Sequence, residues 1–449
     1  MEHRRKAIIA LVLAAVAATL ISGCLRIVAD DLYMLPQISE EHQRLQGHLD
    51  QILFDGAEFS APRSGQHRQS IQLRDLDGDG IDEVLAFFSV TSDSKLKIYI
   101  FQMTDGDYVI AEIIEGVGTA FDSIRYVDMD GDGIDEIVVG WQMGDALRYM
   151  TIYSVKDFHC VLLAGEEYFI LTEHDLDGDG TGEIITVRLP SQESGAVAEV
   201  FILMPDGEIV QSEARLSNGI ETIARVLPGR LIDGVPAIFI ESEGKFENGD
   251  LITDICVLKN GSFSNISASG PSGISEDTVR ETVRMRILSS DINNDGIIKV
   301  PMPRLLQAQS ETAYYAIDWY SFNSMGFSRL ALTTYHNNTD EWFLVLPFDW
   351  RGKVSVRRED VVAGERTVIF SYIVGEDGPY EDFLKVYRIT GDAREERARL
   401  PGRVFLASEG AAVFAFELLT PANSFGLSFS EVLIEDNFRL IYSDWLAGS

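Results

Sequence analysis

Three short acidic segments repeat along the chain with the same residue types at the same positions. In each, positions 1, 3 and 5 are aspartates, position 6 is glycine and position 9 is glutamate. Calcium takes roughly six to eight oxygen ligands, and alternate residues of a tight loop can aim their carboxylates at one centre. Glycine permits the turn, and the carbonyl of position 7 adds a ligand. The pattern predicts three calcium sites, made by Asp75, Asp77, Asp79, Ile81 and Glu83, by Asp128, Asp130, Asp132, Ile134 and Glu136, and by Asp175, Asp177, Asp179, Thr181 and Glu183.

Two alternatives to calcium fit these segments less well. Solvated acidic turns would hold several carboxylates close together with no cation to offset their repulsion. An Asp/Glu pair can act as acid and base in glycoside cleavage, but three copies of one catalytic pair make little sense. The segments also differ from an EF-hand, whose bidentate acid comes at position 12 between helices. Here strand-like residues follow the acid at position 9, which indicates a calcium loop within a β-hairpin.

A fourth and weaker copy begins at Asp291, with Asn293 and Asp295 at positions 3 and 5. Lys299 stands where the other copies have glutamate, so the pattern does not assign calcium there. Between the third and fourth copies, residues 228–240 keep a turn and a strand around Asp233 but lack the other acids. This segment is expected to be a degenerate unit.

The three strong copies are separated by about 50 residues, a repeat length typical of propellers and arrays, and the fourth begins 116 residues after the third. Each unit contains strand patterns only. Residues 84–88 and 96–101 are apolar runs, and the Asp105-Gly106 turn that follows is a hairpin signal. We therefore expect an all-β fold over residues 39–449, a β-propeller of about seven four-stranded blades with calcium-binding hairpin loops. Six blades is the main alternative, because unit boundaries beyond residue 300 depend on strand patterns alone.

One short N-terminal helix is expected before the first blade. Ser39 can cap it, and Leu45, Leu49, Ile52 and Leu53 then fall on one face. This apolar face predicts packing against the first blade.

The N-terminus has the order of an export signal. Arg4, Arg5 and Lys6 precede an apolar run over 7–21 that is short for a membrane span, and small residues lead to Cys24. This order resembles the bacterial lipobox, in which the cysteine thiol takes a diacylglycerol and becomes the mature N-terminus. An uncleaved N-terminal anchor is the alternative. We expect a signal peptide over 1–23, lipidation at Cys24, a tether over 24–38, and a protein lipid-anchored at the extracytoplasmic face of the cell membrane.

The composition excludes a nucleic-acid partner. The chain has 71 acidic and 37 basic residues, and no basic cluster that would offset the repulsion of phosphates. Cys160 and Cys256 lie in apolar, strand-like stretches of different units and are expected to be unpaired. The seven histidines are scattered, and no Gly-rich phosphate loop, nucleophile elbow or zinc motif occurs.

Two further groups of residues are candidates for a site. Exposed aromatic rings make sugar platforms, but large aromatics at strand spacing more often fill the space between blades. The aromatic group contains Tyr314, Tyr315, Trp319, Tyr320, Trp342 and Trp350. A second group, Asp318, Glu341, Asp349 and Asp444, supplies carboxylates of the kind that a catalytic cleft needs. Nothing in their spacing marks them as a site.

The three strong loops and their strands resemble the FG-GAP or VCBS repeat family, and the resemblance covers roughly residues 68–210. The family folds like the propeller head of integrin α chains and carries calcium in such hairpin loops. The resemblance implies calcium, mostly structural, at the three strong loops. It does not carry over to the fourth loop, because Lys299 departs from the pattern. Family members include adhesins, carbohydrate-binding proteins and some enzyme modules, so the fold alone does not set the function.

Two classes of function remain. The favoured one is a cell-surface lipoprotein whose calcium-stabilised propeller is a non-catalytic module that binds a glycan or an envelope protein. The alternative is an extracellular polysaccharide hydrolase or lyase on a propeller scaffold. It would require a cleft of titratable residues that calcium does not use.

Overall fold

The computed structural model describes residues 40–441 except 91–94, 117, 146, 157–158, 193, 245–249, 269–277, 281–285, 308, 310 and 376–377. The predicted signal peptide, Cys24, the tether and Ser39 lie outside the described residues, as does Asp444. Within the part of the chain that the structure describes, no helix is both long and apolar enough to cross a membrane.

Antiparallel strands dominate the described chain and form six sheets, numbered here in chain order. Sheet 1 contains β1 (Ala57–Phe59), β2 (Ile71–Arg74), β3 (Glu83–Val90), β4 (Lys95–Thr104) and β5 (Asp107–Gly116). Sheet 2 contains β6 (Ala120–Val127), β7 (Glu136–Gln142), β8 (Arg148–Lys156) and β9 (His159–Tyr168). Sheet 3 contains β10 (Ile170–His174), β11 (Glu183–Arg188), β12 (Val197–Leu203) and β13 (Ile209–Arg215).

The later sheets are less regular. Sheet 4 contains β14 (Ile220–Arg230), β15 (Pro236–Gly244), β16 (Leu251–Lys259), β17 (Ser262–Asn265) and β18 (Val279–Arg280). Sheet 5 contains β19 (Lys299–Leu305), β20 (Tyr315–Phe322), β21 (Ser328–Asn337), β22 (Trp342–Leu346) and β28 (Phe438–Leu440). Sheet 6 contains β23 (Val354–Glu359), β24 (Glu365–Ile373), β25 (Tyr380–Thr390), β26 (Arg403–Glu409) and β27 (Ala412–Leu418). The helices are α2 (Glu40–Phe54), α3 (Arg394–Ala398) and α4 (Glu431–Asn437), with single 3-10 turns η2 (Phe348–Trp350) and η3 (Ser424–Gly426).

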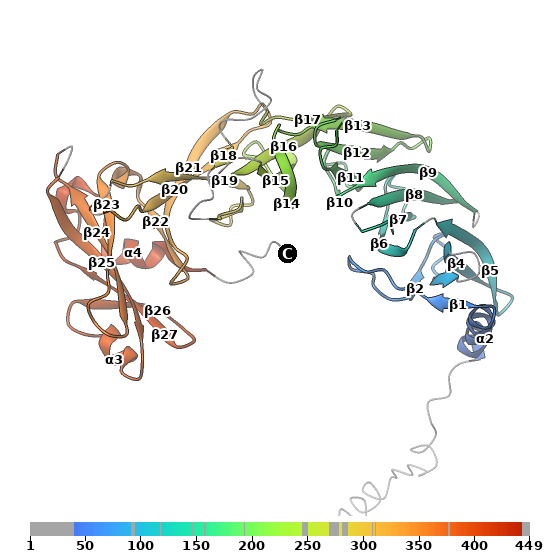
Figure 1. The fold of residues 1–449 in the computed structure, drawn as a ribbon, viewed down its shortest axis with the longest axis horizontal. Coiled ribbons are helices and arrows are strands. Elements are labelled where there is room, and N and C mark those ends of the chain that lie inside the picture. Colours follow the sequence, from blue (N-terminus) through green and yellow to red (C-terminus); the bar gives the residue numbers. More distant parts are fainter. Residues whose placement is uncertain are drawn as a thin grey trace, which may run out of the picture.

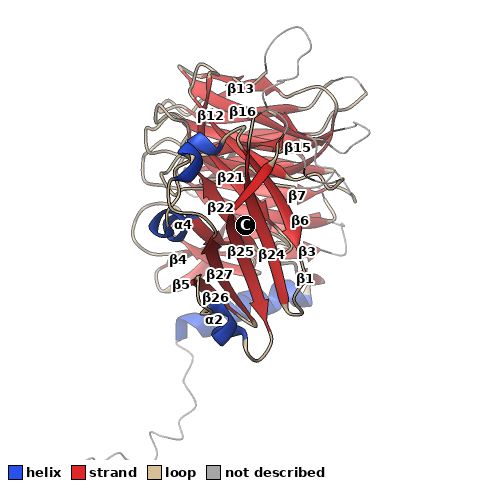
Figure 2. Cartoon of the chain, turned by 90° about the vertical axis from the view of Figure 1, so that its left-hand side faces the viewer, coloured by secondary structure: helices blue, strands red, loops and turns tan. Residues whose placement is uncertain are grey.

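Successive sheets pack face to face, as the blades of a propeller do. One buried hydrophobic cluster joins sheets 1 and 2, another joins sheets 2 and 3, and further clusters join each later sheet to the next. The sheets follow an arc with β6, β10 and β14 on its inner side and β9 and β13 on its outer side (Figure 1). Seen from the sheet 6 end, the strands lie behind one another and the helices lie at the outside (Figure 2).

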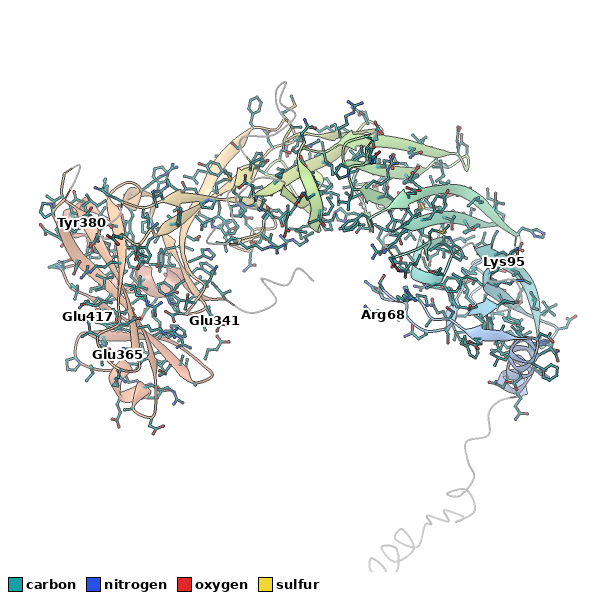
Figure 3. All side chains as sticks on the ribbon, viewed as in Figure 1. Arg68, Lys95, Glu341, Glu365, Tyr380 and Glu417 are labelled. Atoms are coloured by element: carbon teal, nitrogen blue, oxygen red, sulfur yellow. The ribbon has the colours of Figure 1, made fainter. Side chains whose placement is uncertain are left out.

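The described residues do not close this arc into a ring. Arg68, before β2, and Glu341, before β22, lie on the opposite arms of the arc (Figure 3). None of the hydrophobic clusters found among the described residues joins sheet 6 to sheet 1. The last strand, β28, pairs with β22 and so completes sheet 5 rather than sheet 1. The all-β expectation is confirmed, whereas a closed propeller of about seven four-stranded blades is not.

The count of six sheets has a simple origin. The strands β2, β6, β10 and β14 of sheets 1 to 4 begin at Ile71, Ala120, Ile170 and Ile220, so the period of about 50 residues holds there. Sheet 4 is followed by a long connection before β19, and sheet 6 carries α3 and a strand order of β25-β27-β26. The period does not extend across these longer units, so the expected number of about seven blades is not confirmed. Among the sheets of the described residues, sheets 2 and 3 have four strands each and the others have five.

Local sequence explains the regular units. The second strand of sheet 1, β3, is an almost unbroken apolar run and is buried on both faces. The outer strand β5 is mostly exposed or half-buried, and of its residues Ile114 and Gly116 are buried. Between β4 and β5, Asp105 and Gly106 both have positive φ, the conformation of a tight hairpin turn. Cys160 lies on β9 and Cys256 on β16, and both are free, as predicted.

The predicted N-terminal helix is present as α2, and it packs where the sequence indicated. Leu45 and Leu49 are buried in a cluster with sheet 1 residues, including Phe88 and Phe101. Ile52 and Leu53 are partly buried against the same cluster. The apolar stripe of the helix therefore covers the otherwise open face of the first sheet.

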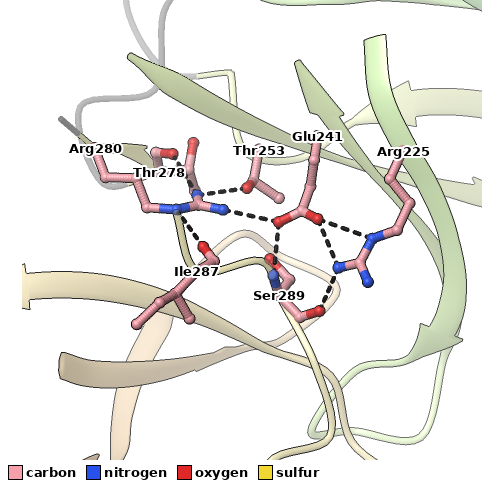
Figure 4. A network of polar contacts seen from close by, with 7 residues as sticks. All are labelled: Arg225, Glu241, Thr253, Thr278, Arg280, Ile287 and Ser289. Carbon is pink, nitrogen blue, oxygen red and sulfur yellow. Dashed lines mark hydrogen bonds and ion pairs between the residues drawn. The ribbon is translucent and has the colours of Figure 1, made fainter. Parts of the chain in front are cut away.

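A buried polar network fixes the long connection between sheets 4 and 5 (Figure 4). Glu241 of β15 accepts hydrogen bonds from Arg225 of β14 at 2.6 and 3.0 Å and from Arg280 of β18 at 2.8 Å. It also accepts the backbone N–H of Ser289 at 2.6 Å. Arg280 in turn donates to the Ile287 carbonyl and to Thr253. One carboxylate thus holds three separate segments together next to the fourth acidic loop.

Candidate metal sites

The three strong acidic loops occupy equivalent places in three consecutive sheets. Residues 75–82 connect β2 to β3, residues 128–135 connect β6 to β7, and residues 175–182 connect β10 to β11. The closing glutamates, Glu83, Glu136 and Glu183, are the first residues of β3, β7 and β11. The predicted hairpin context of the loops is therefore confirmed.

Backbone donors shape each loop in the same way. In the first, Asp75 accepts the N–H groups of Gly78 at 2.8 Å and Gly80 at 2.9 Å, and Asp79 accepts the N–H of Ile81 at 2.7 Å. The second and third loops repeat these contacts from Asp128 and Asp175. Gly78 and Gly80 have φ of 77° and 85°, which only glycine adopts without strain. The aspartates are thus held in place by the loop itself.

The closing glutamates point into the loops from the sheet. They accept the N–H of position 2 with one oxygen, at 2.9 Å for Leu76, 3.1 Å for Met129 and 2.6 Å for Leu176. Burial raises the pKa of Glu83, Glu136 and Glu183 to about 7, and the neighbouring aspartates add to the rise although the N–H bond opposes it. A cation among these carboxylates would relieve their repulsion and favour the ionised glutamate.

Carboxylate oxygens converge in every one of these loops. In each, three side chains offer oxygens that lie within 4.8 Å of one another: Asp75, Asp77 and Glu83; Asp128, Asp130 and Asp132; Asp175, Asp177 and Glu183. Two oxygens that share one ion at about 2.3–2.6 Å lie at most about 5 Å apart, so these oxygens are close enough to share one. The other predicted side chains, Asp79, Glu136 and Asp179, belong to the same loops but not to these tightest groups. The donor sets fit a hard divalent cation.

The loops also contact one another. A Cβ added at Gly131 of the second loop would lie 3.2 Å from the Thr181 methyl of the third, and the Gly182 N–H donates to the Asp128 carbonyl at 3.2 Å. The Ile134 side chain of the second loop lies against Gly78 of the first. The three loops therefore form one continuous rim across sheets 1 to 3.

The fourth loop has a cation of its own. The ammonium of Lys299 donates to Asp291 Oδ1 at 3.2 Å and to the Ile297 carbonyl at 2.9 Å. It also donates to the side-chain oxygens of Asn293 and Asp295. These acceptors stand at positions 1, 3, 5 and 7 of the loop. The sequence showed that Lys299 replaces the closing acid, but not that its ammonium reaches the centre of the loop.

The aromatic group does not form an exposed sugar platform. Trp319, Trp342 and Trp350 are 0%, 1% and 2% exposed and lie in the hydrophobic core. Tyr314 and Tyr320 are half-buried against core clusters. Large apolar rings fill the space within and between sheets 5 and 6, because burial of their surface stabilises the stack. For the three tryptophans the interpretation as core is correct, whereas Tyr315, like the other two tyrosines, is partly exposed.

Two of the carboxylates that could have served a catalytic cleft, those of Asp318 and Asp349, have structural partners. Asp318 is buried and accepts from Arg304 at 2.9 Å and Arg351 at 2.8 Å. Asp349 accepts the Ser428 N–H at 2.6 Å. Glu341 has a φ of 60°, and its carbonyl accepts the N–H of Ile441. These contacts join separate segments of the chain and do not pair an acid with a base.

Comparison with known proteins agrees with the resemblance of the loops. Residues 57–139 match the family model described as FG-GAP-like repeat. This segment is similar to an FG-GAP-like repeat. The match spans sheet 1, β6 and the start of β7, and it includes the first two acidic loops. The resemblance predicted from the loops is thereby confirmed.

Two other comparisons add little. A crystal structure of a protein from Lactobacillus plantarum is 10% identical over 72% of this chain and 85% of that chain, with a TM-score of 0.29. A likeness at this level carries no argument about the fold or the function. The search of curated protein sequences gave no match.

Proposed function

We propose that this protein is a non-catalytic binding module, stabilised by calcium at its three strong loops, that recognises a glycan or an envelope protein. The observation that carries the proposal is the continuous rim of three loops, each with convergent carboxylates. Calcium suits this all-oxygen donor set better than a transition metal would. In the fourth loop, the Lys299 ammonium lies among oxygens at the positions that would supply the calcium ligands of the strong loops. This arrangement supports a cation at the centre of each strong loop.

A groove beside the third loop offers a place for a ligand. Its lining includes Asp175, Asp177 and Asp179 of the third loop, and Arg230, Asp233 and Lys259 of sheet 4 and its loops. Charged groups of both signs can hydrogen-bond the hydroxyls of a glycan or the polar groups of a protein. The groove lies where sheets 3 and 4 meet, next to the rim.

Binding without turnover is the result we expect from the calcium-loaded soluble domain on a glycan array and in a pull-down of envelope fractions. Arg230→Ala should lower the binding, because its exposed guanidinium lines the groove and donates to the Gly234 carbonyl at 3.1 Å. Arg68→Ala is the matched control, since Arg68 is also exposed and donates to a glycine carbonyl, at 3.0 Å, far from the groove. Cleavage of a polysaccharide by the pure protein would overturn the proposal in favour of a hydrolase or lyase.

We also propose that the module is anchored to the membrane by a lipid on Cys24. The support is the order of basic residues, short apolar core and small residues before that cysteine. Cys24→Ser should release the protein from membranes or leave an unprocessed precursor, as measured by detergent-phase partitioning and mass spectrometry. Normal processing and unchanged partitioning of this variant would rule the lipid anchor out.

A further inference from the structure

We propose that the Lys299 ammonium is a built-in cation that takes the place of calcium in the fourth loop, so that this loop keeps its fold without metal. The proposal deepens the assignment of calcium to the other three loops and rests on it. It divides the chain into calcium-dependent sheets 1 to 3 and a calcium-independent part that begins at sheet 5.

The fourth loop shares two backbone contacts with the strong loops. The Gly296 N–H donates to Asp291 at 2.6 Å, as the Gly80 N–H donates to Asp75. The Ile297 N–H donates to Asp295 at 2.9 Å, as the Ile81 N–H donates to Asp79. Lys299 is the first residue of β19, as Glu83 is the first residue of β3. The fourth loop therefore resembles the strong loops in the shape of its backbone.

The ammonium lies where a metal would be expected. Its four acceptors are two carboxylates, an amide oxygen and a backbone carbonyl, at the positions that supply the ligands of the other loops. The lysine side chain is 1% exposed, so these oxygens replace the water around its charge. A buried ammonium without such partners would be costly. The loop and the lysine thus stabilise each other.

The charges of the loop fit a monovalent cation. The strong loops each place three aspartates and one glutamate around the centre, whereas the fourth has two aspartates because Asn293 replaces one and Lys299 replaces the glutamate. Asp291 and Asp295 both form ion pairs with the ammonium. Compared with a strong loop, the fourth loop thus has two fewer negative charges, and the cation at its centre has one positive charge in place of the two of calcium.

Hydrogen exchange of the full soluble domain, with and without a calcium chelator, tests the division. Chelation should raise exchange in residues 75–83, 128–136 and 175–183 and leave residues 291–299 unchanged. Removal of the ammonium by Lys299→Gln should raise exchange in 291–299 whether or not calcium is present. An equal response of all four loops to chelation would overturn the proposal, as would unchanged exchange in Lys299→Gln.

A second variant reads out the metal directly. Lys299→Glu restores the acid at position 9, and it should raise the bound calcium by one ion per chain and make exchange in 291–299 depend on calcium. Lys353→Glu has the same charge change at an exposed site and should bind no additional calcium. If no loop of the unaltered protein responds to chelation, the calcium assignment fails, and the Lys299→Gln result alone decides whether the ammonium holds the loop.

Discussion

Removal of calcium should lower the melting temperature of the soluble domain by roughly 10 °C. For a unit the size of sheets 1 to 3, each kcal/mol of lost stability lowers the melting temperature by about 2–4 °C. Loops of this kind in exported proteins bind calcium with a Kd of about 10⁻⁴ to 10⁻³ M. At ten times Kd, a site that exists only in the folded state stabilises it by about 1.4 kcal/mol, and three such sites by roughly 4 kcal/mol. Calorimetry with calcium and with a chelator measures the difference.

Substitution of single ligands should separate the strong loops from the fourth. Asp77→Ala, Asp130→Ala or Asp177→Ala removes one converging carboxylate and should shrink the calcium-dependent rise in melting temperature. Asp291→Ala is the control. It weakens the contacts of Lys299 and lowers stability, but it should leave the calcium-dependent rise nearly unchanged. The three loops are not structural calcium sites if the chelator leaves the melting temperature unchanged. The same conclusion follows if Asp291→Ala reduces the calcium-dependent rise as much as Asp130→Ala does.

The first half of the fold could be predicted because its signals are local. Each strong loop contains its own turn glycines and its own carboxylates, and the strands that it joins follow directly in the sequence. The contact that shapes the loop, such as Gly78 N–H to Asp75, spans three residues. Nothing distant is needed to place these side chains, so the repeat pattern was sufficient.

The later half depends on pairings that leave little local trace. In β28, Phe438 to Leu440 pair with residues 342–344 of β22, and no pattern in either segment predicts that the two should pair. The same holds for β27, which lies between β25 and β26 in the sheet although it follows β26 in the sequence. Such choices are decided by tertiary packing, here the cluster that contains Trp342, Phe414 and Phe438. The number of sheets and the open arc follow from these long-range contacts.

The polar network of sheet 4 was missed for a related reason. Glu241 follows a run of apolar strand residues and is itself fully buried, whereas Glu243, two residues later on the same strand, is half-exposed. In the sequence the two glutamates look alike. Only the positions of Arg225 and Arg280, which approach from other strands, distinguish them.

Glu241→Ala should destabilise the protein by about 3–5 kcal/mol, because it leaves two guanidinium groups buried without their counter-charge. The side chains of Glu241 and Arg280 are 0% and 3% exposed, so water cannot replace the lost contacts. The Ser289 N–H also loses its acceptor, and the connection that leads to the fourth loop loosens. Unfolding in urea measures the loss of stability, and hydrogen exchange in residues 286–299 should report the loosening.

Glu243→Ala provides the matched control for this prediction. Glu243 pairs with Arg286 at 2.8 Å, from the same strand to the same connection, but the two side chains are 42% and 56% exposed. An ion pair in that setting contributes about 0–1 kcal/mol, so its loss should hardly change the free energy of unfolding. The two variants remove the same chemical group from neighbouring positions and differ in burial. A loss in Glu241→Ala no larger than that in Glu243→Ala would therefore mean that the buried carboxylate does not hold sheet 4 to its connection.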